Sequence, residues 1–194
     1  KTVEESDIYE WNYNRPFADS PDSFVTLDGK TDEDVWHDKD RVWYEYSSDG
    51  VYYTATTMFS ENGMYVGAYA LDTNVYWAAI YNGGLNSSFT LSIVRANETE
   101  RNLIHPGRVA DYVIDPLSTK SYRETRFNVA THIKSADGKY NTSTDPVDHK
   151  TESFGFELFV SWDSLGIDES EKGPCGFPEA MKIHIAYRAI SSSV

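Results

Sequence analysis

Residues 154–162 read FGFELFVSW, and the alternation in this stretch decides the fold class. Every second position holds a large apolar side chain: Phe154, Phe156, Leu158, Val160 and Trp162. Because successive side chains of a strand point to opposite faces, a period of two places these five residues on one face. The stretch therefore predicts a strand with one face in a hydrophobic core and Glu157 on the other face.

Similar runs, rich in aromatic and β-branched residues, recur along the chain and are expected as strands. They lie at 8–13, 41–48, 51–60, 63–72, 74–81, 88–95, 108–115, 123–133 and 180–190. Asn62-Gly63, between two of these runs, is a strong hairpin signal. The polar segments 96–107 and 135–153 are expected as long loops.

No sustained helical period interrupts this pattern. We therefore predict an all-β chain that folds as an antiparallel, jelly-roll-like β-sandwich. Its 194 residues are expected to form one domain, with residues 1–23 as a loosely attached N-terminal segment. The chain opens without an apolar leader, which fits a cytosolic protein, a mature form or a domain cut from a larger protein, and we expect the last of these.

The charge and aromatic content narrow the classes of ligand. A net charge of -14 disfavours nucleic acid and anionic membranes but suits neutral ligands such as sugars, as well as cations. No apolar stretch approaches the roughly 20 residues of a membrane-spanning helix. Aromatic residues make up 14% of the chain, and their flat faces can pack in sheets or against ligands.

The stretch FVTLDGKTDEDVWHDKD, residues 24–40, places an acidic turn between a strand-like run and Trp36. Gly29 allows the positive φ needed to leave the strand, and Thr31 with Asp34 predicts a capping box on a short helical turn near 31–37. The alternative is a calcium site with ligands from Asp28, Asp32 and Asp34. Because Ca²⁺ needs six to eight oxygen ligands, other loops would have to contribute.

Three segments in this order resemble the family 9 carbohydrate-binding modules. They are LDGKTDEDVW (27–36), GMYVGAYALDTNVYW (63–77) and FGFELFVSWDSLGI (154–167), and AMKIHIAYRAI (180–190) resembles the strand that follows in that family. The resemblance implies an antiparallel β-sandwich that binds sugars, often with a structural calcium ion. It also implies a non-catalytic domain of a secreted bacterial protein, often appended to a glycoside hydrolase. The sugar-facing tryptophan of the family would correspond to Trp77, or to Tyr76 if the register shifts by one residue.

The segment around Trp77 has the residue types that hold a sugar. Rings stack on the C–H face of a pyranose, and amides or carboxylates bind its hydroxyl groups. The candidate rings are Trp77, Tyr76 and Tyr81, and the candidate polar groups are Asp72, Asn74 and Asn82. Because residues 76 and 77 face opposite ways in a strand, only one of them can be the platform, and the other is expected in the core.

We therefore predict a carbohydrate-binding module, secreted or on the cell surface, whose partners are a neutral oligo- or polysaccharide and other domains of the same polypeptide. A rival interpretation is a structural or interaction domain without a sugar ligand. It rests on residues 86–90, NSSFT, which stand where the family usually has an Asp-x-x-Glu pair. Glycoside hydrolysis would need a second acid facing Glu157, and the sequence shows no evident partner.

Overall fold

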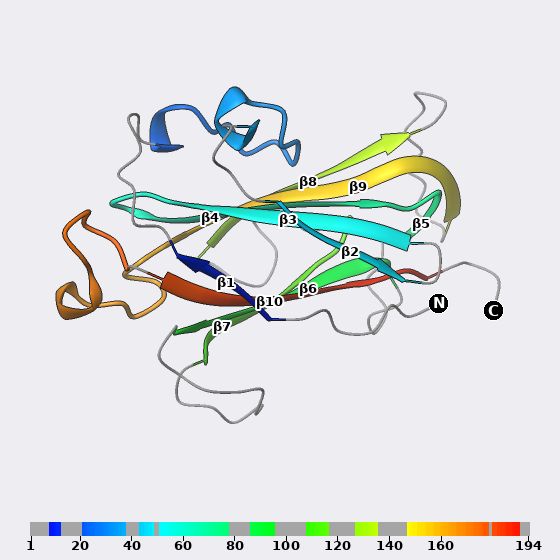
Figure 1. Cartoon of the computed structure of the whole chain (residues 1–194). Helices are drawn as coiled ribbons and strands as arrows, with labels where there is room; N and C mark the ends of the chain where they lie inside the picture. The colour runs from blue at the N-terminus through cyan, green and yellow to red at the C-terminus, as the bar shows by residue number, and fades with distance from the viewer. Residues whose placement is uncertain are drawn as a thin grey trace.

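The computed structural model describes residues 8–12, 21–37, 43–48, 51–77, 86–95, 108–116, 127–135, 147–178 and 180–190. In this part of the chain ten strands form two antiparallel sheets, stacked as the two layers of a sandwich (Figure 1). The four-stranded sheet has the order β1 (Ile8–Asn12), β10 (Ala180–Arg188), β6 (Ser88–Arg95) and β7 (Arg108–Ile114). The six-stranded sheet contains β2 (Tyr44–Ser48), β3 (Val51–Phe59), β4 (Gly63–Leu71), β5 (Asn74–Trp77), β8 (Phe127–Ser135) and β9 (Val147–Ser161).

This architecture confirms the predicted all-β sandwich, and each observed strand overlaps a predicted one. The hairpin at Asn62-Gly63 is present, with β3 and β4 paired from Phe59 opposite Met64. Ile8–Asn12, within the segment expected to be loosely attached, forms β1 and pairs along five residues with β10. No helix in the described residues is long and apolar enough to cross a bilayer.

β9 organises the six-stranded sheet because it pairs along both edges. β4 lies beside its second half and β5 beside its first half, in one continuous register along the same edge, and β8 runs along the other edge. β4 and β5 are thus two parts of one path, interrupted at Asp72 and Thr73. The predicted sugar-binding segment therefore begins within this break and continues along the same edge of β9.

The prediction of a loop over residues 135–153 is wrong at its C-terminal end, because β9 already begins at Val147. The residues 147–153, VDHKTES, lack the apolar alternation that marks a half-buried strand. Hydrogen bonding to β5 on one edge and to β8 on the other holds this part as a strand. Long-range pairing therefore decides the local structure where the local pattern gives no signal.

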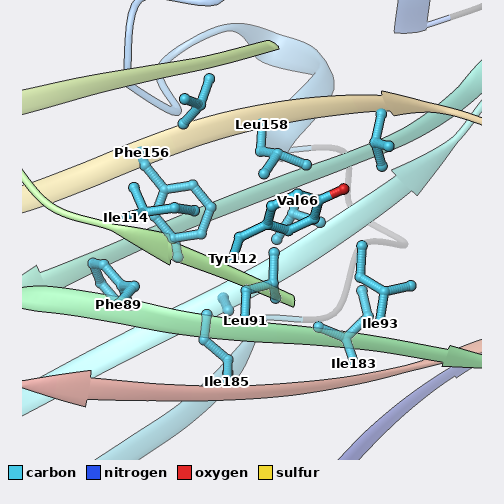
Figure 2. Packing of buried hydrophobic residues seen from close by; sticks show 14 of the residues in the cluster. Val66, Phe89, Leu91, Ile93, Tyr112, Ile114, Phe156, Leu158, Ile183 and Ile185 are labelled. Carbon is cyan, nitrogen blue, oxygen red and sulfur yellow. The ribbon is translucent and has the colours of Figure 1, made fainter. Parts of the chain in front are cut away.

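The hydrophobic core lies between the two sheets (Figure 2). The alternate apolar residues of β9 point into it, and they meet Phe89, Leu91 and Ile93 of β6 and Ile183 of β10 from the facing sheet. Phe89 is fully buried, and its ring contacts the rings of aromatic residues of both sheets. This packing confirms the face of β9 that the sequence assigned to the core.

A second, smaller cluster covers part of the outer face of the six-stranded sheet. Residues 21–37, which include the short helices η1 (Pro21–Ser23) and η2 (Asp34–His37), lie over this face in Figure 1. Trp36 from η2, Met58 from β3 and Tyr65 from β4 form the buried centre of the cluster. A third short helix, η3 (Glu169–Glu171), follows β9 and begins with a capping box at Asp168. Residues 21–37, called the lid below, therefore lie against the sheet and are held there by the buried side chain of Trp36.

Candidate functional site

Asp72, one of the predicted sugar-binding residues, lies at the break between β4 and β5 and is only 6% exposed. One of its carboxylate oxygens accepts a hydrogen bond of 2.7 Å from the hydroxyl group of Tyr187 on β10. Burial raises the pKa of Tyr187 well above its ordinary value, and the charge of Asp72 raises it further, so the phenol remains a donor. Asp72 therefore joins the break to the facing sheet, and its part in sugar binding stays a prediction.

Two hydroxyl groups hold the strand that follows. Thr151 of β9 donates its hydroxyl hydrogen to the carbonyl of Asp72, and its backbone N–H donates to Thr73 at 3.0 Å. Ser87 and Tyr76 exchange two hydrogen bonds. The backbone N–H of Tyr76 donates to the Ser87 Oγ at 3.1 Å, and the backbone N–H of Ser87 donates to the Tyr76 carbonyl at 2.8 Å. The backbone of β5 is thus fixed at its start and at its third residue.

Tyr76 is buried, with 9% of its surface exposed, and Val75 before it is fully buried in the core between the sheets. Trp77 ends β5 and pairs with Val147 of β9. The side chains of Trp77 and Asn74, and the whole of Tyr81 and Asn82, lie outside the described residues. Their assignment to a sugar site stays a prediction.

Glu157 binds the acidic turn to the sheet. Its side chain is fully buried on the outer side of β9. One oxygen accepts hydrogen bonds from the backbone N–H groups of Asp28 and Gly29, both at 2.9 Å, and the other accepts one of 2.8 Å from the indole N–H of Trp36. Since both oxygens bind protein donors and neither reaches solvent, Glu157 is a structural clamp in this arrangement and not an acid facing a substrate.

Burial and hydrogen bonding act in opposite directions on the pKa of Glu157. Burial raises the pKa of Glu157 to about 7, with a smaller contribution from the charge of Glu33, against the lowering effect of the three N–H donors. The clamp is therefore a buried carboxyl group that titrates near neutral pH. A charge there is stabilised only while the turn stays in place.

Three glycines let the turn lie directly on the sheet. Gly29 has a φ of +88°, and a Cβ atom there would come within 2.4 Å of the Thr131 backbone on β8. A Cβ atom at Gly155 of β9 would lie 3.0 Å from the carbonyl of Gly29, and one at Gly67 of β4 would lie 2.9 Å from the Trp36 ring. The turn thus crosses β8, β9 and β4 in contact with their backbones.

The helical turn predicted near residues 31–37 is present, but its cap differs from the prediction. η2 begins at Asp34, so Thr31 does not occupy the N-cap position. Glu33, directly before η2, accepts a 2.7 Å hydrogen bond on its side chain from the backbone N–H of Thr26, seven residues earlier. Asp34 lies in the first turn of η2, where the helix dipole favours a negative charge.

The predicted calcium ligands do not form a compact group among the described residues. No set of three His, Cys, Asp or Glu side chains in this part of the chain is placed to hold a metal ion. Asp28 binds Lys30 instead, through the backbone N–H and through the ammonium group, both at 2.9 Å, and Asp32 and Asp34 are exposed. Burial opposes the charge of Asp28, but the hydrogen bonds from Lys30 lower its pKa overall.

No family model matches the sequence, and neither does any curated protein. Among solved structures, the fold is similar to a family 9 carbohydrate-binding module (CBM9) from Caldicellulosiruptor kristjanssonii, solved in complex with cellotriose. The TM-score is 0.50 at 13% sequence identity, and the match covers 87% of this chain and 74% of that one. The chain has a CBM9-like fold.

Sequence reasoning missed the residues that hold the predicted segment within this CBM9-like fold. Tyr187, Thr151 and Ser87 lie on three different strands or at their ends, and each binds the backbone or side chain of the Asp72–Tyr76 segment. No local motif marks them. The only available signal was the polar residues Ser87 and Thr151 at positions next to strongly apolar runs.

Proposed function

We propose that this chain is a non-catalytic carbohydrate-binding module that binds a neutral oligo- or polysaccharide. The observation that carries the proposal is the fold, which it shares with a module solved in complex with cellotriose. The net charge of -14 supports a neutral ligand over an anionic one. Secretion or display at a bacterial cell surface, beside other domains of the same polypeptide, belongs to the same proposal.

Binding without catalysis agrees with the chemistry of Glu157. A glycosidase needs two carboxyl groups on either side of the scissile bond. Glu157 has the raised pKa of a general acid, but it is fully buried and saturated by three N–H donors. These hydrogen bonds support a structural role for this residue.

We assign the sugar platform to Trp77, with Tyr81, Asn74 and Asn82 as neighbours. Tyr76 is 9% exposed and offers little ring surface for stacking, so we keep the predicted Trp77 as the platform. Asp72 contributes by fixing the break before β5 through Tyr187, so its effect on a sugar is indirect.

Isothermal titration calorimetry with cellohexaose, xylohexaose and short mixed-linkage glucans tests this function. We expect the wild-type chain to bind at least one of them, and Trp77→Ala to weaken that binding by about tenfold or more. Phe24→Ala is the matched aromatic control, because Phe24 is 51% exposed on the outer segment and is not assigned to the site. No heat of binding across the panel would favour the rival, a structural or interaction domain.

A further inference from the structure

The lid formed by residues 21–37 covers only part of the outer face of the six-stranded sheet, and a groove of about 550 Å³ lies beside it. One wall is the turn at residues 29–32. The floor comes from β4 and β9, with Tyr69, Leu71, Ser153 and Gly155. The groove has the size of a typical small-ligand pocket, and neither Asp72 nor Tyr76 is among its lining residues.

The floor exposes apolar side chains on the outer face of the six-stranded sheet, away from the hydrophobic core between the sheets. Leu71 is 48% exposed, one of three large apolar side chains so exposed in the described residues. Tyr69 lies two residues earlier on the same face of β4, and Tyr52 of β3 is paired directly opposite Leu71. Gly155 of β9 is paired opposite Tyr69 and adds no side chain to the floor, and Tyr69, Leu71 and Gly155 all line the groove.

The wall of the groove is held in place. The turn is fastened to β9 by Glu157 and packs at Gly29 against the backbone of β8. A rigid wall lowers the cost of ordering on binding, which is the benefit of a preformed site.

Both lysine side chains that line the groove form ion pairs. Lys134 on the far rim forms an exposed ion pair of 2.6 Å with Glu152, and Lys30 in the wall forms one of 2.9 Å with Asp28. Burial lowers the pKa of His132, and the charge of Lys30 lowers it further, so the imidazole is neutral at neutral pH. A chain that carries a net charge of -14 thus has here a groove without a strong field of either sign, which complements an uncharged polar ligand.

We propose that this groove is a second glycan-binding site, which takes a stretch of a neutral oligosaccharide across β4, β9 and β8. A sugar ring lies on Tyr69 and Leu71, and its hydroxyl groups bind Lys134, Glu152 and Asp32 on the rims. The inference rests on the proposed function, because it takes carbohydrate binding as given and adds a site separate from Trp77. Long chains that reach both sites would bind more tightly than short ones through a higher effective concentration.

The test compares Leu71→Asn and Tyr69→Ala with a matched control in calorimetry with cellohexaose and xylohexaose. Val113→Asn is the control, because Val113 is 50% exposed on β7 of the opposite sheet. We expect each groove variant to weaken binding of the hexasaccharide by about tenfold and Val113→Asn to leave it unchanged. Lys134→Ala gives a second readout that does not depend on packing, because the lysine side chain is 66% exposed.

The outcomes separate this site from the proposed function itself. Residual binding by Trp77→Ala that disappears when Leu71→Asn is added supports two sites. Binding that is lost in Trp77→Ala and unchanged in all three groove variants overturns the groove and leaves the proposed function standing. No binding by the wild-type chain overturns both. A dimer in sedimentation that Leu71→Asn dissociates would make this face a contact between copies and would also overturn the proposal.

Discussion

The carboxylate of Glu157 accepts a 2.8 Å hydrogen bond from the indole N–H of Trp36, and this contact joins residues 121 positions apart in the sequence. The same carboxylate binds the backbone of Asp28 and Gly29. The turn at Asp28 and Gly29 is thus held in place by a residue of β9, the longest described strand. One wall of the groove depends on that contact.

The stability of the protein is expected to depend on pH through Glu157. Its pKa is 4.5 in the unfolded chain and about 7 in the folded protein, so between these values the folded state binds more protons. The free energy of unfolding therefore falls as pH rises through this window, by on the order of 1–3 kcal/mol from this group. Urea unfolding of the wild-type chain and of Glu157→Gln at pH 5, 6, 7 and 8 measures it.

In that comparison the advantage of the wild-type chain over Glu157→Gln should shrink from pH 5 to pH 8, because glutamine does not titrate. The variant should be less stable at every pH, since its NH₂ group faces an N–H donor and one hydrogen bond is lost, at a cost of about 1–3 kcal/mol. A difference that stays constant, or grows toward pH 8, would contradict the assignment.

Gly29→Ala is expected to destabilise the fold by about 2–4 kcal/mol. The added methyl group would meet the backbone of Thr131 at 2.4 Å, and the φ of +88° is unfavourable for alanine. Gly176→Ala is the matched control, with a φ of +83° and 3.5 Å to the nearest atom, and should cost about 1 kcal/mol. Thermal unfolding followed by circular dichroism compares them, and equal losses would show that only the backbone conformation matters.

The strands were predictable because each carries its own evidence. Alternation places the apolar side chains of β9 on one face whatever the partner strand is, and the burial of Phe154, Phe156 and Leu158 confirms it. The early start of β9 at Val147 was not predictable, because polar residues there depend on pairing with β5 and β8. Pairing with the neighbouring strands, and not the local sequence pattern, therefore determines where β9 begins.

The site was predictable only in part for the same reason. The sequence placed Glu157 on the face of its strand opposite the core, but only the sheet register brings it beside Gly29 and Trp36. Asp72 was selected as a polar group near an aromatic residue, and the contact with Tyr187 that draws it inside comes from the facing sheet. Contacts between distant strands leave no local trace in the sequence.

Calcium removal tests the metal prediction. If Asp28, Asp32 and Asp34 take part in a calcium site, the remaining oxygen ligands must come from other segments, because no group of three is assembled in the described residues. We expect excess EDTA to lower the Tm and excess CaCl₂ to restore it, since an ion bound only by the folded state stabilises it. Asp32→Asn should reduce this shift, and identical melting curves with and without EDTA would exclude a structural ion.

Tyr187→Phe is expected to destabilise the protein by about 1–3 kcal/mol, because it leaves the buried carboxylate of Asp72 without the 2.7 Å donor. Tyr53→Phe is the control: that ring lies in the same core and contacts Tyr187, but its hydroxyl group donates to the neutral carbonyl of Ile185 at 3.3 Å. It should cost about 1 kcal/mol or less.

The two variants are compared by urea unfolding and then by glycan titration at a temperature where both are folded. Since Asp72 fixes the break before β5, Tyr187→Phe should also weaken binding at Trp77, whereas Tyr53→Phe should not. Equal effects of the two variants on both measurements would assign Asp72 no special part in positioning that segment.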